Sequence, residues 1–507
     1  DEEMPAPLDP VVEKIIPLLP LRDPSVMTPV SAREALRALA AARAAVPPPP
    51  VASAEDIRVK GAAGFLNARV YRMGAAKAPT VVFFHGGAWM SGAGSLSLYN
   101  GAELARSGDV VVVAVNYRLG ALGYLNVAGL PGSGSGANYG LLDHVAARET
   151  AIVGRAVEWA NLNSGSRNAS GLAHVLAVLE AEARRLPAEV VRIPTRASTT
   201  VADDGTVRTE AHADALKITA RPDAPLQVVL TGHYDTVFPA ESPFQTVTTR
   251  ADGALNGPGI ADMKGGISVM LAALEAFETH PDRARVGWTV LLSPDEEIGS
   301  PASAPLLAEL GARGHVGMTY EPALSDGTLA GARKGSGNYH LIVTGKAAHA
   351  GRAFHEGANA VAGAAIIAAR LHALNGQREG VTVNVAKISG GGALNVVADN
   401  AVVRFNVRVP DAQASAWISE TVRQIATEPP FPGLTLDLHG GMTRAPKPMD
   451  ASQTALFHAV RDAGDLLGQT IAWKPSGGVC EGNNLHAAGL PNVDTLGVEL
   501  LDPVPDR

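Results

Sequence analysis

The sequence predicts an α/β protein that contains an α+β insertion and is preceded by an incomplete α/β segment. In the second half, buried strand-like runs alternate with helical stretches, about one strand–helix step at a time. From about Lys334 the order becomes strand, helix, strand, strand, helix, strand. Residues 1–147 hold about five strands, too few to complete a sheet without open edges.

The composition of the sequence excludes several classes of protein. The 507 residues include 46% hydrophobic and 18% charged residues, which is ordinary globular composition, and the length predicts about three domains. A net charge of −8 argues against nucleic-acid binding. Cys480 is the only cysteine, so no internal disulfide can form. No apolar run is long enough for a membrane span, and the acidic N-terminus does not look like a signal peptide. We therefore expect no membrane partner and a cytoplasmic location.

Hydrophobic patterns define the elements of the second half. Apolar residues at helical spacing predict a helix over 171–185, introduced by the polar turn at 164–170. A glycine-rich turn, 257–266, leads into a helix over 266–277 that is apolar almost all round, so we expect it to be buried. Buried strands are predicted over 226–231, 286–292 and 316–320.

Acids and a histidine follow these strands. They are His233 and Asp235 after the first, Glu296 and Glu297 after the second, Glu321 after the third, and Asp262 in the glycine-rich turn. An α/β sheet collects such residues at the carboxyl ends of its strands. Adjacent acids are costly there unless a cation compensates them, and one imidazole with several carboxylates suits zinc. Each motif alone could be an ordinary polar turn, but together they predict a metal site.

The strand and helix order after Lys334 predicts a ferredoxin-like insertion. Its strands are expected over 339–344, 381–388, 401–409 and 434–438, and its helices over 359–374 and 414–426. We accordingly expect a main domain made of 148–332 and 445–507, with the insertion at 333–444.

Residues from about Trp159 to Gly497 resemble the zinc-dependent aminoacylase/carboxypeptidase family. That family includes acetylornithine deacetylase, succinyl-diaminopimelate desuccinylase and glutamate carboxypeptidase. Five motifs occur in the family's order, namely His233-Tyr-Asp235, Gly257–Gly266, Asp295–Glu297, Tyr320–Pro322 and Gly345–Gly351. The resemblance implies a mixed sheet flanked by helices, a two-zinc site, and an insertion that serves as lid and as the interface of a homodimer.

The resemblance also implies a role for each site residue. His233, Asp262 and Glu321 would bind the first zinc, Asp262 and Glu297 the second, and Asp235 would orient His233. Glu296 would act as general base, and the Asp262–Met263 peptide would be cis. From the lid, His349 would stabilise the oxyanion, while Asn395, Arg408 and Arg444 would contact a substrate carboxylate. A salt bridge within the sheet is the alternative for Arg408.

The C-terminal residues depart from the family pattern. After the glycine loop at 476–484 and the strand at 491–497, the family has a histidine that binds the second zinc. This sequence continues through 498–507 without a histidine, and His486 lies too early in the pattern to be assumed a substitute. We therefore expect a C-terminally truncated domain with a weakened second site, reduced activity, and one or two Zn²⁺ per chain, with Co²⁺ or Mn²⁺ as alternatives.

Residues 1–147 carry a different resemblance. The helical periodicity of 9–40 and the strands of 51–72 resemble the start of a hormone-sensitive-lipase-like esterase. A strand then runs into His85-Gly-Gly, a turn that in α/β-hydrolases directs N–H groups at an oxyanion, and 95–143 resemble a type-B carboxylesterase. The sequence contains no Gly-x-Ser-x-Gly motif, so no nucleophile can be assigned. We interpret this incomplete α/β-hydrolase-like segment as part of a chimera; a natural extension is the alternative.

The leading functional hypothesis is a metal-dependent hydrolase of N-acyl amino acids or small peptides with a free carboxylate. A carboxylesterase carried by the N-terminal segment and a non-catalytic fusion product are the alternatives. Metal content separates the first from the second, and turnover separates the first from the third.

Overall fold

The computed structural model describes residues 53–61, 64–72, 80–84, 111–115, 148–466 and 469–499. The chain divides into two compact units, Asp1–Glu149 and Thr150–Arg507. Among the described residues, no helix combines the length and the hydropathy that a membrane crossing requires.

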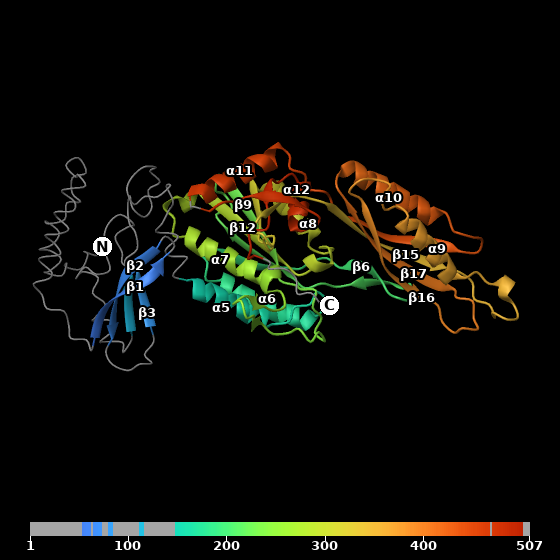
Figure 1. The fold of residues 1–507 in the computed structure, drawn as a ribbon, viewed down its shortest axis with the longest axis horizontal. Coiled ribbons are helices and arrows are strands. Elements are labelled where there is room, and N and C mark those ends of the chain that lie inside the picture. Colours follow the sequence, from blue (N-terminus) through green and yellow to red (C-terminus); the bar gives the residue numbers. More distant parts are fainter. Residues whose placement is uncertain are drawn as a thin grey trace, which may run out of the picture. The chain divides into compact units, whose positions relative to one another are not determined.

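The first unit contains a four-stranded sheet of order β1-β2-β4-β3 (Figure 1). Its strands are β1 (Ser53–Gly61), β2 (Gly64–Arg72), β3 (Thr80–Phe84) and β4 (Val111–Val115). β1, β2 and β4 pair antiparallel, and β3 pairs parallel with β4. β1, β2 and β3 occur where the sequence predicts strands, at 51–72 and directly before His85. The His-Gly-Gly turn at 85–87, the motifs of 116–143 and the helical pattern of 9–40 lie outside the described residues.

The second unit is built on a six-stranded mixed sheet of order β20-β13-β9-β12-β8-β5. The strands are β5 (Glu189–Ile193), β8 (Ala215–Ala220), β9 (Leu226–His233), β12 (Val286–Ser293), β13 (Val316–Thr319) and β20 (Asn492–Val493). The first four in sheet order run parallel, while β8 and β5 are antiparallel to their neighbours. The mixed sheet expected from the family resemblance is therefore confirmed.

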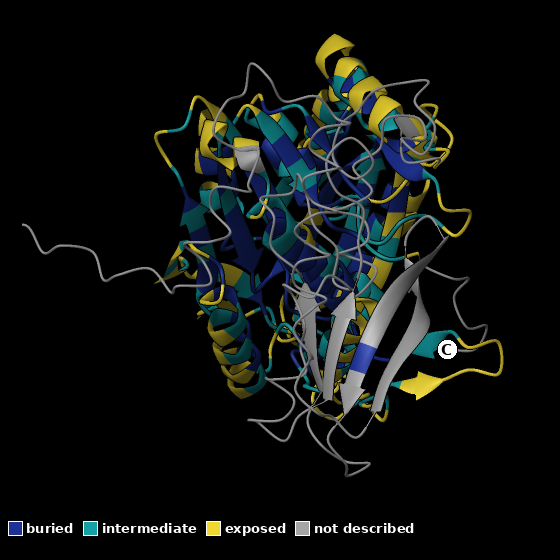
Figure 2. Cartoon of the chain, turned by 90° about the vertical axis from the view of Figure 1, so that its left-hand side faces the viewer, coloured by how far each residue is buried: buried dark blue, intermediate teal, exposed yellow. Residues whose placement is uncertain are grey.

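Helices cover both faces of this sheet because its central strands are apolar on both sides. Leu230 of β9 and Leu292 of β12 pack with α6 (Ala169–Ala183) and α7 (Gly266–Phe277). The alternate residues, Val229 and Leu291, pack with α8 (Ala304–Arg313) and α12 (Glu481–Ala487). Each such burial stabilises the fold by about 1.5–3 kcal/mol. In Figure 2 much of the central strands is dark blue, whereas many helices have yellow outer faces.

The helix α7 is buried, as its composition predicts, and it begins beside the metal-site motifs. Seven of its twelve residues are buried. A Cβ at Gly266 would collide with the main-chain oxygen of Tyr320, so only glycine allows the helix to start this close to the end of β13. This contact sets the separation between the glycine-rich turn and Glu321.

The inserted domain has the ferredoxin-like order that the sequence predicts. Its elements are β15 (Gly335–Thr344), α9 (Ala360–His372), β16 (Thr382–Gly390), β17 (Asn400–Val409), α10 (Ala412–Thr427) and β18 (Thr435–Arg444). The strands form an antiparallel sheet of order β16-β17-β15-β18. Both helices pack on it through Ile367 and Ile418. Side chains of Asn359 and Asp411 cap the two helices by accepting N–H groups.

A buried ion network lies where this insertion joins the main sheet. β14 (Leu329–Arg333) pairs with β19 (Trp473–Ser476), and Arg333 also pairs with Lys447 through the main chain. Arg333 donates twice to Asp494, at 2.8 Å each, and Lys447 Nζ lies 2.5 Å from the same carboxylate. All three side chains are almost fully buried. The Asp494 carboxylate, next to β20, therefore pairs with Arg333, where the chain enters the insertion, and with Lys447, where the chain leaves it.

The remaining elements lie at the edges of the second unit. They are α5 (Glu149–Ala160), the hairpin β6 (Ser198–Val201) and β7 (Val207–Glu210), the short pair β10 (Thr248–Thr249) and β11 (Leu255–Asn256), and α11 (Ala451–Leu466). Val201 of the hairpin packs against Ile342 and Val402 of the insertion.

Candidate active site

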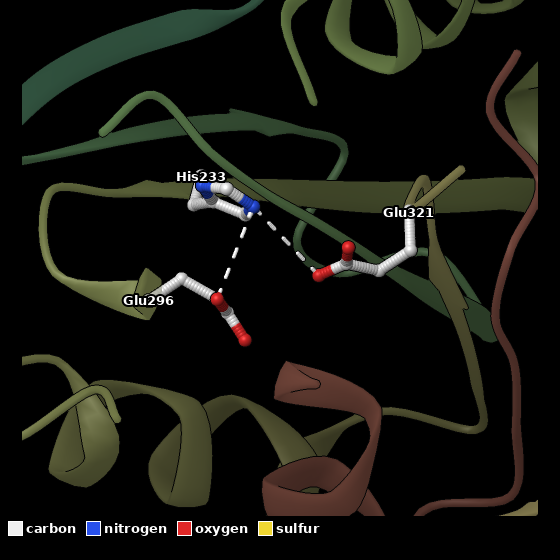
Figure 3. Close-up of side chains that lie close together, drawn as sticks. All are labelled: His233, Glu296 and Glu321. Carbon is white, nitrogen blue, oxygen red and sulfur yellow. Dashed lines mark ion pairs between the residues drawn. The ribbon is translucent and has the colours of Figure 1, made fainter. Parts of the chain in front are cut away.

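Three adjacent parallel strands bring the predicted ligands to one edge of the sheet. His233 is the last residue of β9, Glu296 and Glu297 begin the turn after β12, and Glu321 follows β13. His233 Nε2 lies 4.0 Å from Glu296 Oε2 and 3.9 Å from Glu321 Oε1. Figure 3 shows these three side chains pointing toward one another.

Asp235 fixes the orientation of His233. The ring Nδ1 lies 3.1 Å from the main-chain oxygen of Asp235 and 3.3 Å from its Oδ1. The Asp235 carboxylate also accepts the N–H groups of Glu296 and Glu297. Burial opposes the charged form of His233, but hydrogen bonds to Asp235 and Asp262 raise its pKa well above the usual value. Nδ1 is thereby occupied, and Nε2 faces the carboxylates.

Two groups of ligand atoms have the spacing of a cation site. His233, Glu296 and Glu321 form one, and His233, Asp262 and Glu297 form the other, with the atoms of each group within 4.8 Å of one another. Imidazole and carboxylate donors suit zinc. Glu321 Oε1 is buried without a hydrogen-bond partner, as expected of an atom that would bind a cation.

The electrostatics of the carboxylates support the same fit. Burial raises the pKa of Glu321 well above its usual range, and nearby negative charges raise it further. Burial also raises the pKa of Glu297 to about 8. These groups are costly to ionise together, and a divalent cation would remove that cost. The residues present therefore fit a metal ion.

The turn around Asp262 has the geometry that the family resemblance implies. The Asp262–Met263 peptide is cis, as predicted. Asp262 Oδ1 lies 3.0 Å from His233 Nε2, and the side chain is 49% exposed. Asp262 thus stands between the buried cluster and the solvent.

Two arginines of the insertion approach Glu296. Arg444 Nη1 lies 2.7 Å from Glu296 Oε1. Arg408 donates through Nε to Asn406, and the positive charge of Arg444 contributes, after burial, to lowering the pKa of Arg408. Arg408 Nη1 and Arg444 Nε are buried without a hydrogen-bond partner. These donors are available to an anionic group of a ligand.

Other predicted residues lie away from the cluster. His349 is exposed, and its Nδ1 accepts the N–H of Gly351. Asn395 is also exposed, and its main-chain oxygen accepts the N–H of Ala350. The two loops meet through a bridge between His349 and Val396. His486 Nε2 lies 3.9 Å from Asp450, and His486 belongs to neither group of ligand atoms.

Sequence reasoning missed Glu481, which is fully buried at the start of α12. Its Oε1 accepts a short hydrogen bond from Ser293, and its Oε2 has no partner. Burial raises its pKa to about 8, against the effects of Ser293 and of a protonated His233. The sequence feature that could have indicated this residue is an acid directly after a glycine-rich loop, at the start of a short helix.

Family comparisons agree with this geometry. Residues 331–433 match the family model of the M20 peptidase dimerisation domain. The chain is 27% identical to carboxypeptidase G2 of Pseudomonas sp. (strain RS-16) over 361 residues, which cover 69% of this chain and 82% of that protein. The second unit therefore resembles the M20 metallopeptidases in sequence. With its cluster of histidine and carboxylate ligands, it is a metal-dependent hydrolase of the peptidase/aminoacylase kind.

A solved structure has a similar fold to this second unit. A tripeptidase from Staphylococcus aureus superposes with a TM-score of 0.53 at 21% identity, covering 70% of this chain and 90% of that chain. At this identity the likeness concerns the fold alone.

The N-terminal segment has relatives of another kind. Residues 66–149 match the carboxylesterase family model. The chain is 49% identical to the para-nitrobenzyl esterase of Bacillus subtilis over 69 residues, and it spans only 14% of that protein's length. The chain thus joins an esterase-like segment to an M20-like unit, which supports the chimera interpretation.

Proposed function

We propose that the M20-like unit hydrolyses the amide bond of N-acyl amino acids, or of small peptides, that carry a free carboxylate. The observation that supports this most directly is the position of Glu296 beside the His233 cluster. We assign 148–332 and 445–507 to the catalytic domain and 333–444 to the lid, and we propose that Zn²⁺ is the metal.

The two oxygens of Glu296 have different surroundings. Oε1 pairs with Arg444, whereas Oε2 faces His233 at 4.0 Å. A divalent cation bound at the cluster would lower the pKa of a water molecule and polarise the scissile carbonyl. Glu296 would accept the proton of the attacking water at Oε2 and return it to the leaving amine, while Arg444 holds the other oxygen in place.

The free carboxylate of the substrate would meet the arginines of the lid. Arg408 Nη1 and Arg444 Nε are buried donors without partners, and such donors are costly unless a ligand satisfies them. A guanidinium group binds a carboxylate through charge-assisted hydrogen bonds. We propose that His349 and Asn395, which lie on exposed lid loops, approach a substrate only when the lid moves or when a second subunit presents them.

We also propose a homodimer that forms through the lid. β16 is at the edge of the lid sheet, where unpaired main-chain groups favour association. Nearby apolar side chains are exposed, namely Val361, Ile366, Ile388, Leu394 and Val396. All of them lie within the segment that matches the dimerisation domain.

Metal analysis combined with turnover tests this proposal. The full chain would be loaded with Zn²⁺ and given a panel of N-acyl amino acids and dipeptides. We expect metal-dependent release of amine and a fall in kcat of about 10²–10⁴-fold in Glu296→Gln with the metal retained. Glu379→Gln, at an exposed lid position, is the matched control. Absence of turnover in the metal-loaded chain, or full activity of Glu296→Gln, would contradict the proposal.

A further inference from the structure

A cleft of about 1170 Å³ opens directly beside the candidate metal ligands. Asp262 and Glu297 line it, and most of its remaining wall is apolar. The wall comes from α5, from the segment that follows β9, from the glycine-rich turn at 257–265 and from α7. Its apolar residues include Ile152, Val153, Val237, Ile260 and Val269. Ligand sites are typically concave and apolar with a few polar groups at one end, and this cleft has that character.

Two phenylalanines form an aromatic wall of the cleft. Phe238 and Phe244 meet edge to face, with ring centroids 5.0 Å apart and an interplanar angle of 64°. Val153 and Val237, which also line the cleft, remain 44% and 51% exposed. Apolar side chains gathered around a hollow mark a ligand-binding surface more often than isolated exposed residues do. A flat ring is the ligand that such a wall binds best.

The charges of the lining limit the kind of ligand further. Three acids, Asp262, Glu297 and Glu499, face a single arginine, Arg250. When a cation neutralises Asp262 and Glu297, the cleft still has no excess of positive charge. An acyl group that carries its own carboxylate would therefore be disfavoured, and a neutral apolar group would be favoured.

We propose that this cleft is the acyl-binding site, and that the preferred substrates are N-acyl amino acids whose acyl group is aromatic and uncharged. This inference rests on the proposed function and adds the substrate class. The cleft lining includes Asp262 and Glu297 but neither Arg408 nor Arg444. With the scissile carbonyl at the cluster, the acyl group enters the cleft while the amino-acid carboxylate meets the arginines.

Paired substrates test the proposal. The Zn²⁺-loaded full chain would be assayed with N-benzoylglycine, N-acetylglycine, N-succinylglycine and N-acetylphenylalanine. The first two would also be titrated calorimetrically into Glu296→Gln, where binding is read without turnover. We expect N-benzoylglycine to bind at least about tenfold more tightly than N-acetylglycine, because a well-fitting apolar group in a pocket gives about 10–200-fold discrimination.

A variant that fills the cleft provides the second part of the test. Val153→Trp puts an indole into the space on the cleft side of α5, whereas Glu158→Trp adds the same group at an exposed position of this helix outside the lining. We expect Val153→Trp to reduce the benzoyl-to-acetyl ratio about tenfold and Glu158→Trp to leave it unchanged. Phe244→Ala should also lower the ratio.

The outcomes separate this inference from the proposed function. Equal binding of the benzoyl and acetyl compounds, or a ratio that Val153→Trp does not alter, would overturn the acyl site even if N-acetylglycine is hydrolysed. Preference for N-succinylglycine would overturn the uncharged class. Preference for N-acetylphenylalanine that Val153→Trp abolishes would assign the cleft to the amino-acid side chain instead. If no amide is hydrolysed, the proposed function fails, and the calorimetric ratio alone decides whether the cleft binds aromatic acyl groups.

Discussion

The guanidinium group of Arg444 contacts both the carboxylate and the main-chain oxygen of Glu296. Its Nη1 lies 2.7 Å from Oε1 of Glu296, and its Nη2 donates to the main-chain oxygen of the same residue at 3.1 Å. Arg444 is the last residue of β18 in the lid, whereas Glu296 follows β12 of the main sheet. A lid residue therefore orients the proposed general base, in addition to any contact that it makes with a substrate carboxylate.

Replacing Arg444 should impair catalysis through Glu296. In Arg444→Lys the charge remains, but a lysine cannot make both contacts at once. We expect kcat to fall at least about tenfold, with the bound metal unchanged. Arg444→Ala should in addition destabilise the fold by about 3–5 kcal/mol, because it leaves a buried carboxylate without its partner.

An exposed ion pair provides the control for this prediction. Arg423 and Glu420 pair on the surface of α10, where both side chains are more than half exposed. Arg423→Lys should leave kcat and stability unchanged, because exposed pairs contribute about 0–1 kcal/mol. An Arg444→Lys variant with normal kcat would show that Glu296 does not depend on this contact.

Metal titration should reveal one strongly bound ion in the described site. Both groups of ligand atoms contain His233, and its Nδ1 is occupied by Asp235. One imidazole nitrogen can serve only one ion, so a second ion would have carboxylates alone, which favour harder cations than zinc. We expect one Zn²⁺ to remain after dialysis and His233→Ala to abolish its binding. Two tightly held Zn²⁺ per chain would contradict this expectation, and His486→Ala, which changes a histidine outside both groups, should retain the metal.

The sequence predicts most of the fold because the strands of both sheets have strong apolar patterns. The ends of β9, β12, β16 and β17 lie within two residues of their expected positions, whereas β15 begins four residues earlier and β18 ends six residues later than expected. Glu296, Glu297 and Glu321 follow strand ends, as predicted, and His233 is the last residue of its strand. Contacts between distant segments could not be predicted in this way. The pairing of Arg444 with Glu296 depends on where the lid meets the main sheet, and the burial of Glu481 depends on how α12 packs against the end of β12.

Glu481 should make stability depend on pH. Its pKa is about 8 in the folded protein, compared with an ordinary value of 4.5. The folded protein therefore holds this proton more tightly than the unfolded chain does. Below pH 4.5 Glu481 is protonated in both states, so it should not make the free energy of unfolding change with pH. Its contribution should fall as the pH rises from 4.5 to 8 and should be constant above pH 8. Glu481→Gln, which stays neutral, should remove this fall, on the order of a few kcal/mol.

Denaturant unfolding of the metal-free protein between pH 5 and 9 would measure this effect. Metal must be absent because a cation nearby would favour ionised Glu481. Glu379→Gln, at an exposed position of the lid, should leave the pH profile as it is in the unmodified chain. A Glu481→Gln profile that matches the unmodified chain would mean that Glu481 ionises normally.

Charges placed on the exposed lid surface should dissociate the proposed homodimer. Leu394 is 102% exposed and Val396 44% exposed, in the loop that follows the edge strand β16. Burying one leucine contributes about 1.5–3 kcal/mol, and a two-fold interface contains each residue twice. The double change Leu394→Asp and Val396→Asp should therefore raise the dimer dissociation constant at least about a hundredfold, as measured by analytical ultracentrifugation. Val207→Asp, at a 44% exposed valine of the β6–β7 hairpin, should leave the dimer intact. A monomeric unmodified chain, or a double variant that remains dimeric, would rule out this interface.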